Sequence, residues 1–196
     1  MRLDRLFLIF ITIFITLSFG AEDIDLNVTS KLRRELIPLG KTVFKVINLK
    51  SEKETRVDLT GENFILISVR EHGSDGRFYA VDSDGTVWWS GAVTSGARAF
   101  RSPSGIFNII QKKRYHMSTK YPDENGINNM DYMLKFTKYG HALHKGSVDW
   151  MSHGCIHISI KDIPTLFKWA NRDTKVVVTR HSYMPFAKDD LKKIYY

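Results

Sequence analysis

The sequence predicts a mainly β fold, an antiparallel sandwich or barrel-like sheet, with one helix after residue 158. Segments rich in β-branched and aromatic residues recur along the chain, and turn-forming Gly, Asp, Asn and Ser residues separate them. Between residues 159 and 170 the apolar residues return at helical spacing instead. No internal repeat is found, so 196 residues predict one folded domain.

The expected strands share this β-rich composition and lie at 42–47, 63–69, 77–82, 86–94, 106–110, 130–137, 141–144 and 174–179. The turns 73–76 and 82–85 separate the early strands. The polar segment 115–129 is long enough to predict a functional loop.

The one clear helix begins at a capping box formed by Ser159 and Asp162. Its apolar face is then made by Ile163, Leu166, Phe167 and Ala170. A short amphipathic stretch at 30–36 predicts a small N-terminal helix, and the charged residues 187–196 predict a surface segment.

The N-terminus has the pattern of an export signal. Arg2 and Arg5 precede the apolar run 6–17, and the small residues Ser18 and Gly20 follow it. A run of about 12 residues suits a signal peptide and is short for a membrane-spanning helix, which needs about 20. The sequence therefore predicts cleavage after Gly20, export to the periplasm or cell wall, and membrane contact only through this segment.

The formal net charge of +8 favours an anionic partner such as a cell-wall polymer or a membrane surface. Nucleic acid is not expected, because the chain contains no recognition motif and its basic residues are scattered.

Cys155 is the only cysteine, and it ends the segment Ser152-His153-Gly154-Cys155. A lone thiol forms no internal disulfide, and a nearby imidazole can take its proton and make it a nucleophile. Glycine before a nucleophile permits a sharp turn. The segment therefore predicts a cysteine acyl-transfer centre. The alternative is that Cys155 is simply a small buried apolar residue.

Two other classes of function stay open. Thiolate and imidazole are the usual zinc ligands, so Cys155 with His141, His144, His153 and His157 would suit a zinc protein. The second class is a non-catalytic wall-binding module, in which the catalytic centre has lost its activity. For the acyl-transfer centre no cofactor is expected and no metal ligand is assigned.

Several segments, in this order, resemble the L,D-transpeptidase catalytic-domain family of bacterial cell-wall enzymes. They are the Ser-His-Gly-Cys core at 152–155, the strand and histidine at 142–146, and the segments 94–96, 102–107 and 131–137. The resemblance covers residues 62–180. This chain departs from the family in two ways: only seven residues separate His144 from Ser152, and His157 stands where Arg or Asn is usual.

The resemblance implies an L,D-transpeptidase-type β-sandwich that acts on peptidoglycan stem tetrapeptides. Cys155 would attack the carbonyl before a terminal D-alanine, and His144 would transfer the proton. D-alanine leaves, and the thioester passes to an amine on the wall or on a protein. With water as acceptor the enzyme would be an L,D-carboxypeptidase.

The remaining predicted site residues support this chemistry. His153 is expected to support the nucleophile, and the amides of Gly154 and Cys155 to hold the oxyanion. The predicted substrate-binding residues are Ser152, which also bonds the loop backbone, His157, which would hold a carboxylate, Gly146, which permits close approach, and Tyr132. His141 is expected to be structural, because residues three apart on a strand face opposite ways.

These observations divide the chain into a signal peptide (1–20), an N-terminal extension with the first strand (21–60), the catalytic domain (61–181) and a C-terminal tail (182–196).

Overall fold

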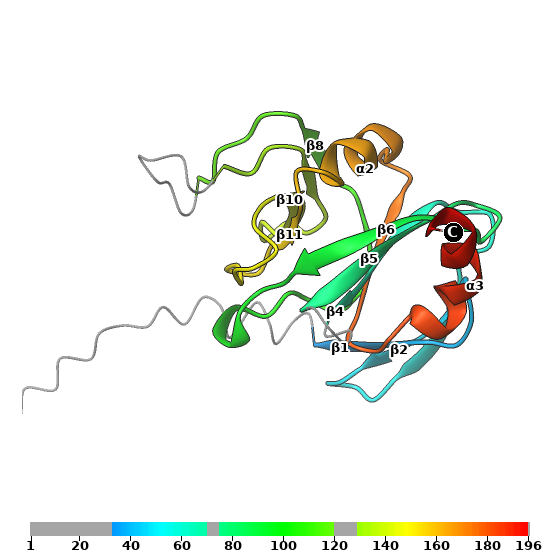
Figure 1. Ribbon diagram of the computed structural model, residues 1–196. Coiled ribbons are helices and arrows are strands. Elements are labelled where there is room, and N and C mark those ends of the chain that lie inside the picture. The colour runs from blue at the N-terminus through cyan, green and yellow to red at the C-terminus, as the bar shows by residue number, and fades with distance from the viewer. Residues whose placement is uncertain (1–32, 70–74, 120–128, 196) are drawn as a thin grey trace, which may run out of the picture.

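The fold is mainly β, as expected, in a computed structural model that describes residues 33–69, 75–119 and 129–195 (Figure 1). A nine-stranded sheet contains β4 (Phe64–Val69), β5 (Gly76–Val81), β6 (Val87–Thr94), β7 (Gly105–Asn108), β8 (Gln111–Lys113), β9 (Met133–Lys135), β10 (Ala142–Lys145), β11 (Ile156–Ile158) and β12 (Lys175–Thr179). Their spatial order is β7-β12-β4-β5-β6-β11-β10-β9-β8. The strand β11, which follows Cys155, therefore pairs with β6, and β10, which carries His144, lies next to β11.

The central strand β4 is buried along its whole length because both faces of the large sheet are covered. Phe64 and Leu66 point into one apolar cluster, and Ile65, Ile67 and Val69 point into another. Alternate residues of a strand face opposite ways, so a strand covered on both faces is expected to be largely apolar. In β4 every residue except Ser68 is apolar, and the buried Ser68 hydroxyl donates to the carbonyl oxygen of His181 at 2.8 Å.

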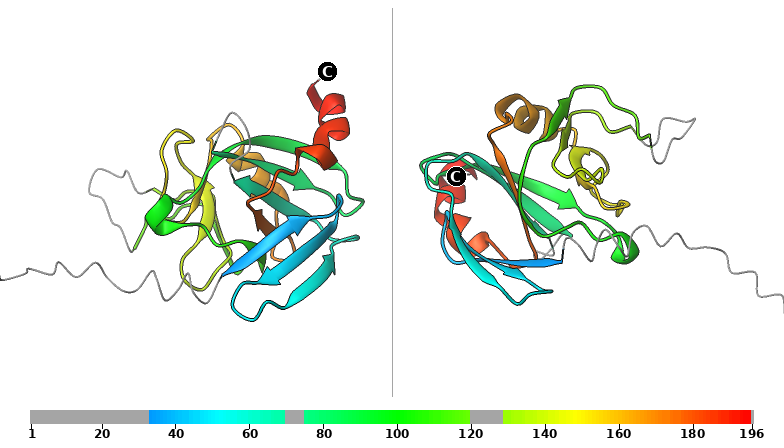
Figure 2. Two further views of the ribbon diagram at one scale, coloured as in Figure 1. Left: turned by 90° about the horizontal axis from the view of Figure 1, so that it is seen from below. Right: turned by 180° about the vertical axis from the view of Figure 1, so that it is seen from behind.

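A second, three-stranded antiparallel sheet covers one face of the large sheet (Figure 2). It contains β1 (Arg34–Pro38), β2 (Val43–Asn48) and β3 (Glu54–Asp58). The helix predicted at 30–36 is therefore wrong from Arg34 onward, and residues 30–32 lie outside the described residues. Leu36 pairs with Val46 and is fully buried, and this pairing outweighs a short amphipathic pattern.

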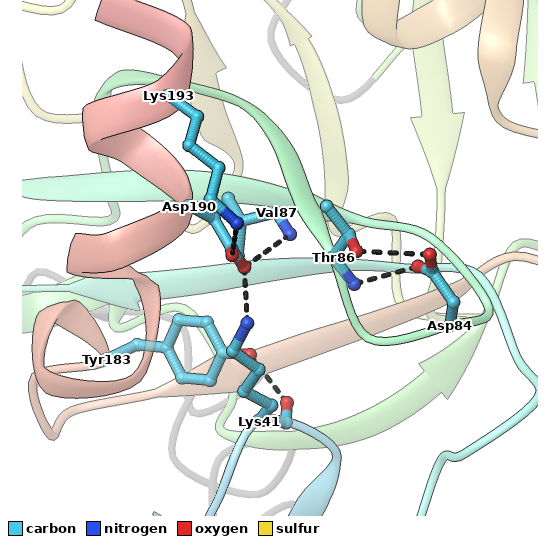
Figure 3. A network of polar contacts seen from close by, with 7 residues as sticks. All are labelled: Lys41, Asp84, Thr86, Val87, Tyr183, Asp190 and Lys193. Carbon is cyan, nitrogen blue, oxygen red and sulfur yellow. Dashed lines mark hydrogen bonds and ion pairs between the residues drawn. The ribbon is translucent and has the colours of Figure 1, made fainter.

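The C-terminal segment forms the helix α3 (Met184–Tyr195), which the sequence did not predict; it lies on the surface and buries one face. Ala187 and Leu191, four residues apart, pack on the same cluster as the small sheet. Asp190 fixes the helix: its carboxylate accepts from Nζ of Lys41 at 2.5 Å and from the amide of Val87 at 3.1 Å (Figure 3). Burial raises the pKa of Asp190, but these donors outweigh it and hold the pKa below its usual value.

The predicted helix after Cys155 is α2 (Ile163–Trp169). Ile163 and Leu166 enter the cluster on the other face of the large sheet, where Leu143 and Ile156 also pack. The sheet therefore curls, and α2 covers the core between its two halves (Figures 1 and 2).

In the described ranges no helix is both long and apolar enough to cross a membrane. The predicted signal segment 1–20 lies outside the described residues, as does most of the predicted loop 115–129.

Candidate active site

Two short parallel strands bring the cysteine segment beside the histidine. In the β10–β11 ladder, Leu143 is opposite Ile156 and His144 is opposite His157. Leu143 and Ile156 are fully buried in the core, so the alternate residues project from the other face. Cys155 immediately precedes β11 and continues that alternation, which puts its thiol on the same face as the imidazole of His144.

The thiol of Cys155 is partly buried. It packs on a small cluster formed by Met130, Met133 and Ala142, with Sγ 3.8 Å from the carbonyl oxygen of Gly140. Burial raises the pKa of Cys155 to about 11, although a hydrogen bond from the backbone of Ala142 opposes the rise. At neutral pH the group is therefore a thiol, and a base must remove its proton when it attacks.

His144 has the properties of that base. Its ring is buried, and Nδ1 lies 2.7 Å from the carbonyl oxygen of Lys145. A carbonyl oxygen only accepts, so Nδ1 carries the proton and Nε2 is left with a free lone pair. Burial, and to a smaller extent the nearby His157, lower the pKa of His144 to about 4. The imidazole is therefore neutral at neutral pH and can accept a proton.

Cys155 and His144 are diagonal neighbours on adjacent strands, a spacing that an aromatic side chain such as that of His144 can bridge. A neutral thiol and a neutral imidazole in this arrangement suit general-base activation of a nucleophile. Proton transfer then accompanies attack, and no resting ion pair is required.

The turn before the thiol is fixed by Ser152. Its Oγ donates to the carbonyl oxygen of Cys155 at 2.5 Å and accepts from the amide of Gly154 at 3.0 Å. Ser152 thus bonds the loop backbone as predicted. The Gly154 amide, predicted to hold an oxyanion, thus donates to Ser152 in the structure. Gly154 is required for another reason: its φ is +109°, and a Cβ would lie 3.0 Å from the ring of His141.

A second segment, following β6, clamps this turn. Gly96 forms a parallel bridge with Ser152, whose amide donates to the carbonyl oxygen of Ser95 at 3.0 Å. Ser102 accepts from the amide of Gly96 at 3.0 Å and donates to the carbonyl oxygen of Gly154 at 2.9 Å. Ser95, Gly96 and Ser102 lie in segments of the family resemblance, but the sequence predicted no role for them. Because they are small, two backbone segments can approach closely here, and the Ser102 hydroxyl can hydrogen-bond to both.

His153 and His141, two other histidines near Cys155, have different environments. The exposed His153 packs edge-on against Phe100, at the end of the 3₁₀ helix η1 (Arg98–Phe100), with ring centroids 4.8 Å apart. Nδ1 of His141 lies 2.8 Å from the hydroxyl of Thr137, and its ring stacks on Phe136. His141 is therefore tied to its own turn, in agreement with a structural role.

His157 lies under the loop that joins β10 to the nucleophile turn. Its Nδ1 is 3.0 Å from the carbonyl oxygen of Ser147 and 3.2 Å from that of Trp150. A Cβ on Gly146 would lie 2.5 Å from Cγ of His157, so Gly146 permits close approach as predicted. Burial lowers the pKa of His157, although the two carbonyl bonds oppose this. The suggestion that His157 is a cation for a substrate carboxylate is not supported.

Tyr132 lies away from Cys155, on the opposite side of the site strands. Its ring packs edge-on against Phe167 of α2 at 5.6 Å, and the guanidinium of Arg114 lies over it at 3.5 Å. This side chain belongs to the main core cluster, whereas Cys155 contacts the small one.

No three His, Cys, Asp or Glu side chains in the described ranges gather closely enough to hold a metal ion, so the zinc alternative has no ligand set there. Two hollows, of about 320 and 420 Å³, lie elsewhere. One is lined by residues around Asn63 and Asn171, the other by residues around Val46 and Ile106, and neither includes Cys155.

Comparison with protein families matches residues 62–178 to the L,D-transpeptidase catalytic domain. Comparison with curated protein sequences finds no match.

Solved structures share the fold at low identity. An L,D-transpeptidase from Stackebrandtia nassauensis is 20% identical, with a TM-score of 0.51 over 60% of this chain and 55% of its own. An L,D-transpeptidase from Mycobacterium smegmatis is 16% identical, with a TM-score of 0.51 over 71% of this chain and 68% of its own. An LD transpeptidase in complex with imipenem is 18% identical, with a TM-score of 0.52 over 70% of this chain and 67% of its own. The chain thus spans just over half the length of the Stackebrandtia enzyme.

Proposed function

The chain belongs to the L,D-transpeptidase catalytic-domain family, and on that premise we propose that it cleaves and rejoins peptidoglycan stem peptides through a thioester on Cys155. The observation that carries the proposal is the placement of the Cys155 thiol and the neutral His144 imidazole on one face of paired strands. The substrate is a stem tetrapeptide that ends in D-alanine.

In the first half-reaction Nε2 of His144 takes the thiol proton while Sγ of Cys155 attacks the carbonyl carbon before the D-alanine. The carbon–nitrogen bond breaks, and His144 returns the proton to the leaving amine. D-alanine departs and the acyl group remains on sulfur as a thioester.

In the second half-reaction an amine of another stem peptide, or of a wall protein, attacks the thioester. His144 takes a proton from the attacking amine, the carbon–sulfur bond breaks, and sulfur regains a proton. The product is a cross-link between the acyl group and the amine. If water attacks instead, the same centre acts as an L,D-carboxypeptidase.

The proposed setting is outside the cytoplasm, in the periplasm or cell wall, because residues 1–20 have the pattern of a signal peptide. N-terminal sequencing of the mature protein tests this: we expect it to begin at Ala21. A mature protein that begins at Met1 and fractionates with membranes would contradict cleavage.

The activity is tested by incubation of the purified protein with a wall tetrapeptide that carries a free side-chain amine. Mass spectrometry should detect free D-alanine and a cross-linked dimer. Tripeptide and D-alanine without dimer would identify the carboxypeptidase. Absence of D-alanine release by a folded protein would refute both.

The similarity to a protein solved with imipenem suggests a second probe. A strained β-lactam ring offers an activated carbonyl to the same thiol, so we expect imipenem to acylate Cys155.

A further inference from the structure

His157 lies between the loop 146–152 and the proposed base. On the loop side, Nδ1 is within hydrogen-bond distance of two carbonyl oxygens, those of Ser147 and Trp150. Both oxygens only accept, so Nδ1 carries the proton and donates to both. One side chain thus closes the loop across four residues.

A second strand contributes to the same anchoring. Thr94 is the register partner of His157 on β6, and its hydroxyl donates to the carbonyl oxygen of Val148. Three carbonyl oxygens of the loop therefore bond to two side chains that stand side by side on the sheet. The loop is held from below even though Trp150 and Met151 are exposed.

On its other side, the ring of His157 packs edge-on against the ring of His144, with centroids 5.0 Å apart. The two residues are opposite each other in the parallel β10–β11 ladder. Because the hydrogen bond to Lys145 fixes one edge of the His144 ring, contact with His157 leaves that ring little freedom to rotate.

Gly146 locks the two sides together. A Cβ at this position would lie 2.5 Å from Cγ, 2.7 Å from Cδ2 and 2.9 Å from Cβ of His157. The chain therefore crosses directly against the imidazole ring as it leaves β10. Any larger residue at 146 must displace either the loop or the ring.

We propose that His157 is a positioning residue that fixes the loop 146–152 with its Nδ1–H and holds the His144 ring in place with its own ring. This inference rests on the proposed acyl-transfer function and adds a determinant of its geometry. His157 acts through His144 and the loop, and contact with substrate is not part of its role.

The position of the donor atom gives a sharp test. The side-chain nitrogen of Asn stands two atoms from Cβ, as Nδ1 of His does, whereas that of Gln stands one atom further out. His157→Asn should keep the loop bonds, and His157→Gln should lose them. His157→Arg should behave like Gln, since its nearest donor, Nε, stands as far from Cβ as the Gln nitrogen and its two Nη donors lie further out.

The measurement is acylation of the full chain by imipenem, resolved into a limiting rate and a half-saturating concentration, together with amide hydrogen exchange of residues 146–152. We expect His157→Asn to leave loop exchange unchanged but to lower the limiting rate about threefold, because it lacks the ring that packs against His144. We expect His157→Gln to lower it about tenfold and to speed exchange in the loop, while the half-saturating concentration changes little. A lower limiting rate with an unchanged half-saturating concentration indicates that the substitution disturbs the position of the base and not the binding of imipenem.

Gly146→Ala tests the same contact from the loop side and should also lower the limiting rate. Its matched control is Gly40→Ala, where the added Cβ meets only Val43 at 3.9 Å, and which should leave the rate unchanged.

Equal limiting rates and equal loop exchange in His157→Asn, His157→Gln and the wild type would overturn the inference. If the wild type itself is not acylated, the proposed function fails instead, and the exchange comparison alone decides whether His157 anchors the loop. Should His157→Gln fail to fold, Gly146→Ala against Gly40→Ala decides by the same limiting rate.

Discussion

The two halves of the large sheet are built differently. In one half, β4, β5, β6 and β12 are five to eight residues long, and β4 and β5 are almost entirely buried. In the other half, β8 to β11 have only three or four residues each. Their inner face joins the core, and their outer face carries Cys155, His144 and His157.

This difference separates stability from chemistry. The long strands supply buried apolar area, which is the main favourable contribution to folding. The short strands set which side chains stand next to one another. Substitutions in the long-strand half should therefore lower stability, and those on the outer face of the site half should lower the rate.

The largest effect is expected on the outer face. His144→Ala should slow acylation by imipenem about 10²–10⁴-fold, the usual cost of removing a general base. His141→Ala is the matched control, since this ring is tied to Thr137 and should matter much less. The rates are compared by stopped-flow or by time-resolved intact mass. If His141→Ala lost more activity than His144→Ala, the assignment of the base would be reversed.

The long-strand half should respond in the opposite sense. Ile67→Ala on β4 removes a fully buried side chain and should cost about 2–5 kcal/mol in the free energy of unfolding. Chemical denaturation measures this cost. The acylation rate of the folded variant should stay within a few-fold of wild type. The control Ile160→Ala, at an exposed position, should change stability by less than about 0.5 kcal/mol.

The contacts of α3 predict a smaller, pH-dependent effect. Asp190→Asn weakens the bonds to Lys41 and Val87 and should cost about 1–3 kcal/mol at pH 7. Because the folded pKa of Asp190 is lowered, its contribution is complete above the unfolded value of about 3.9 and is lost as pH falls through the folded pKa. Urea titrations of both proteins should therefore converge in acid. A difference that stayed constant down to pH 2 would contradict this.

The smallest effect concerns pH and activity. With the pKa of His144 near 4 and that of Cys155 near 11, both groups keep their protonation states between about pH 5 and 9. The limiting acylation rate of the wild type should be nearly flat across that range and should fall as pH approaches 4, where His144 gains a proton. A sharp drop in rate centred near pH 6.5 would indicate a solvated base.

The sequence predicts the long-strand half well and the site half only in part. The runs at 63–69, 77–82, 86–94 and 174–179 are long enough to show their β-rich pattern, and they match β4, β5, β6 and β12. A three-residue strand such as β11 shows no periodicity, and β8 and β11 were missed. The helix α3 was missed because its charged residues obscured the spacing of Ala187 and Leu191.

The site follows the same division. Cys155 and His144 could be proposed as the reacting pair from residue type and motif, because their chemistry is local. The role of His157 could not, because it depends on carbonyl groups at 147 and 150 and on a glycine across the strand. For the same reason the engagement of the Gly154 amide by Ser152 was not foreseen.

The most direct test of the central claim is the mass of the acyl-enzyme formed with a stem tetrapeptide. Wild-type protein is mixed with the tetrapeptide, quenched in acid and digested, and the peptide that contains Cys155 is weighed. The peptide should gain the mass of the tetrapeptide less D-alanine, and Cys155→Ala, folded as judged by its thermal unfolding, should gain nothing. Normal release of D-alanine by folded Cys155→Ala, or an adduct on another residue, would contradict the thioester mechanism.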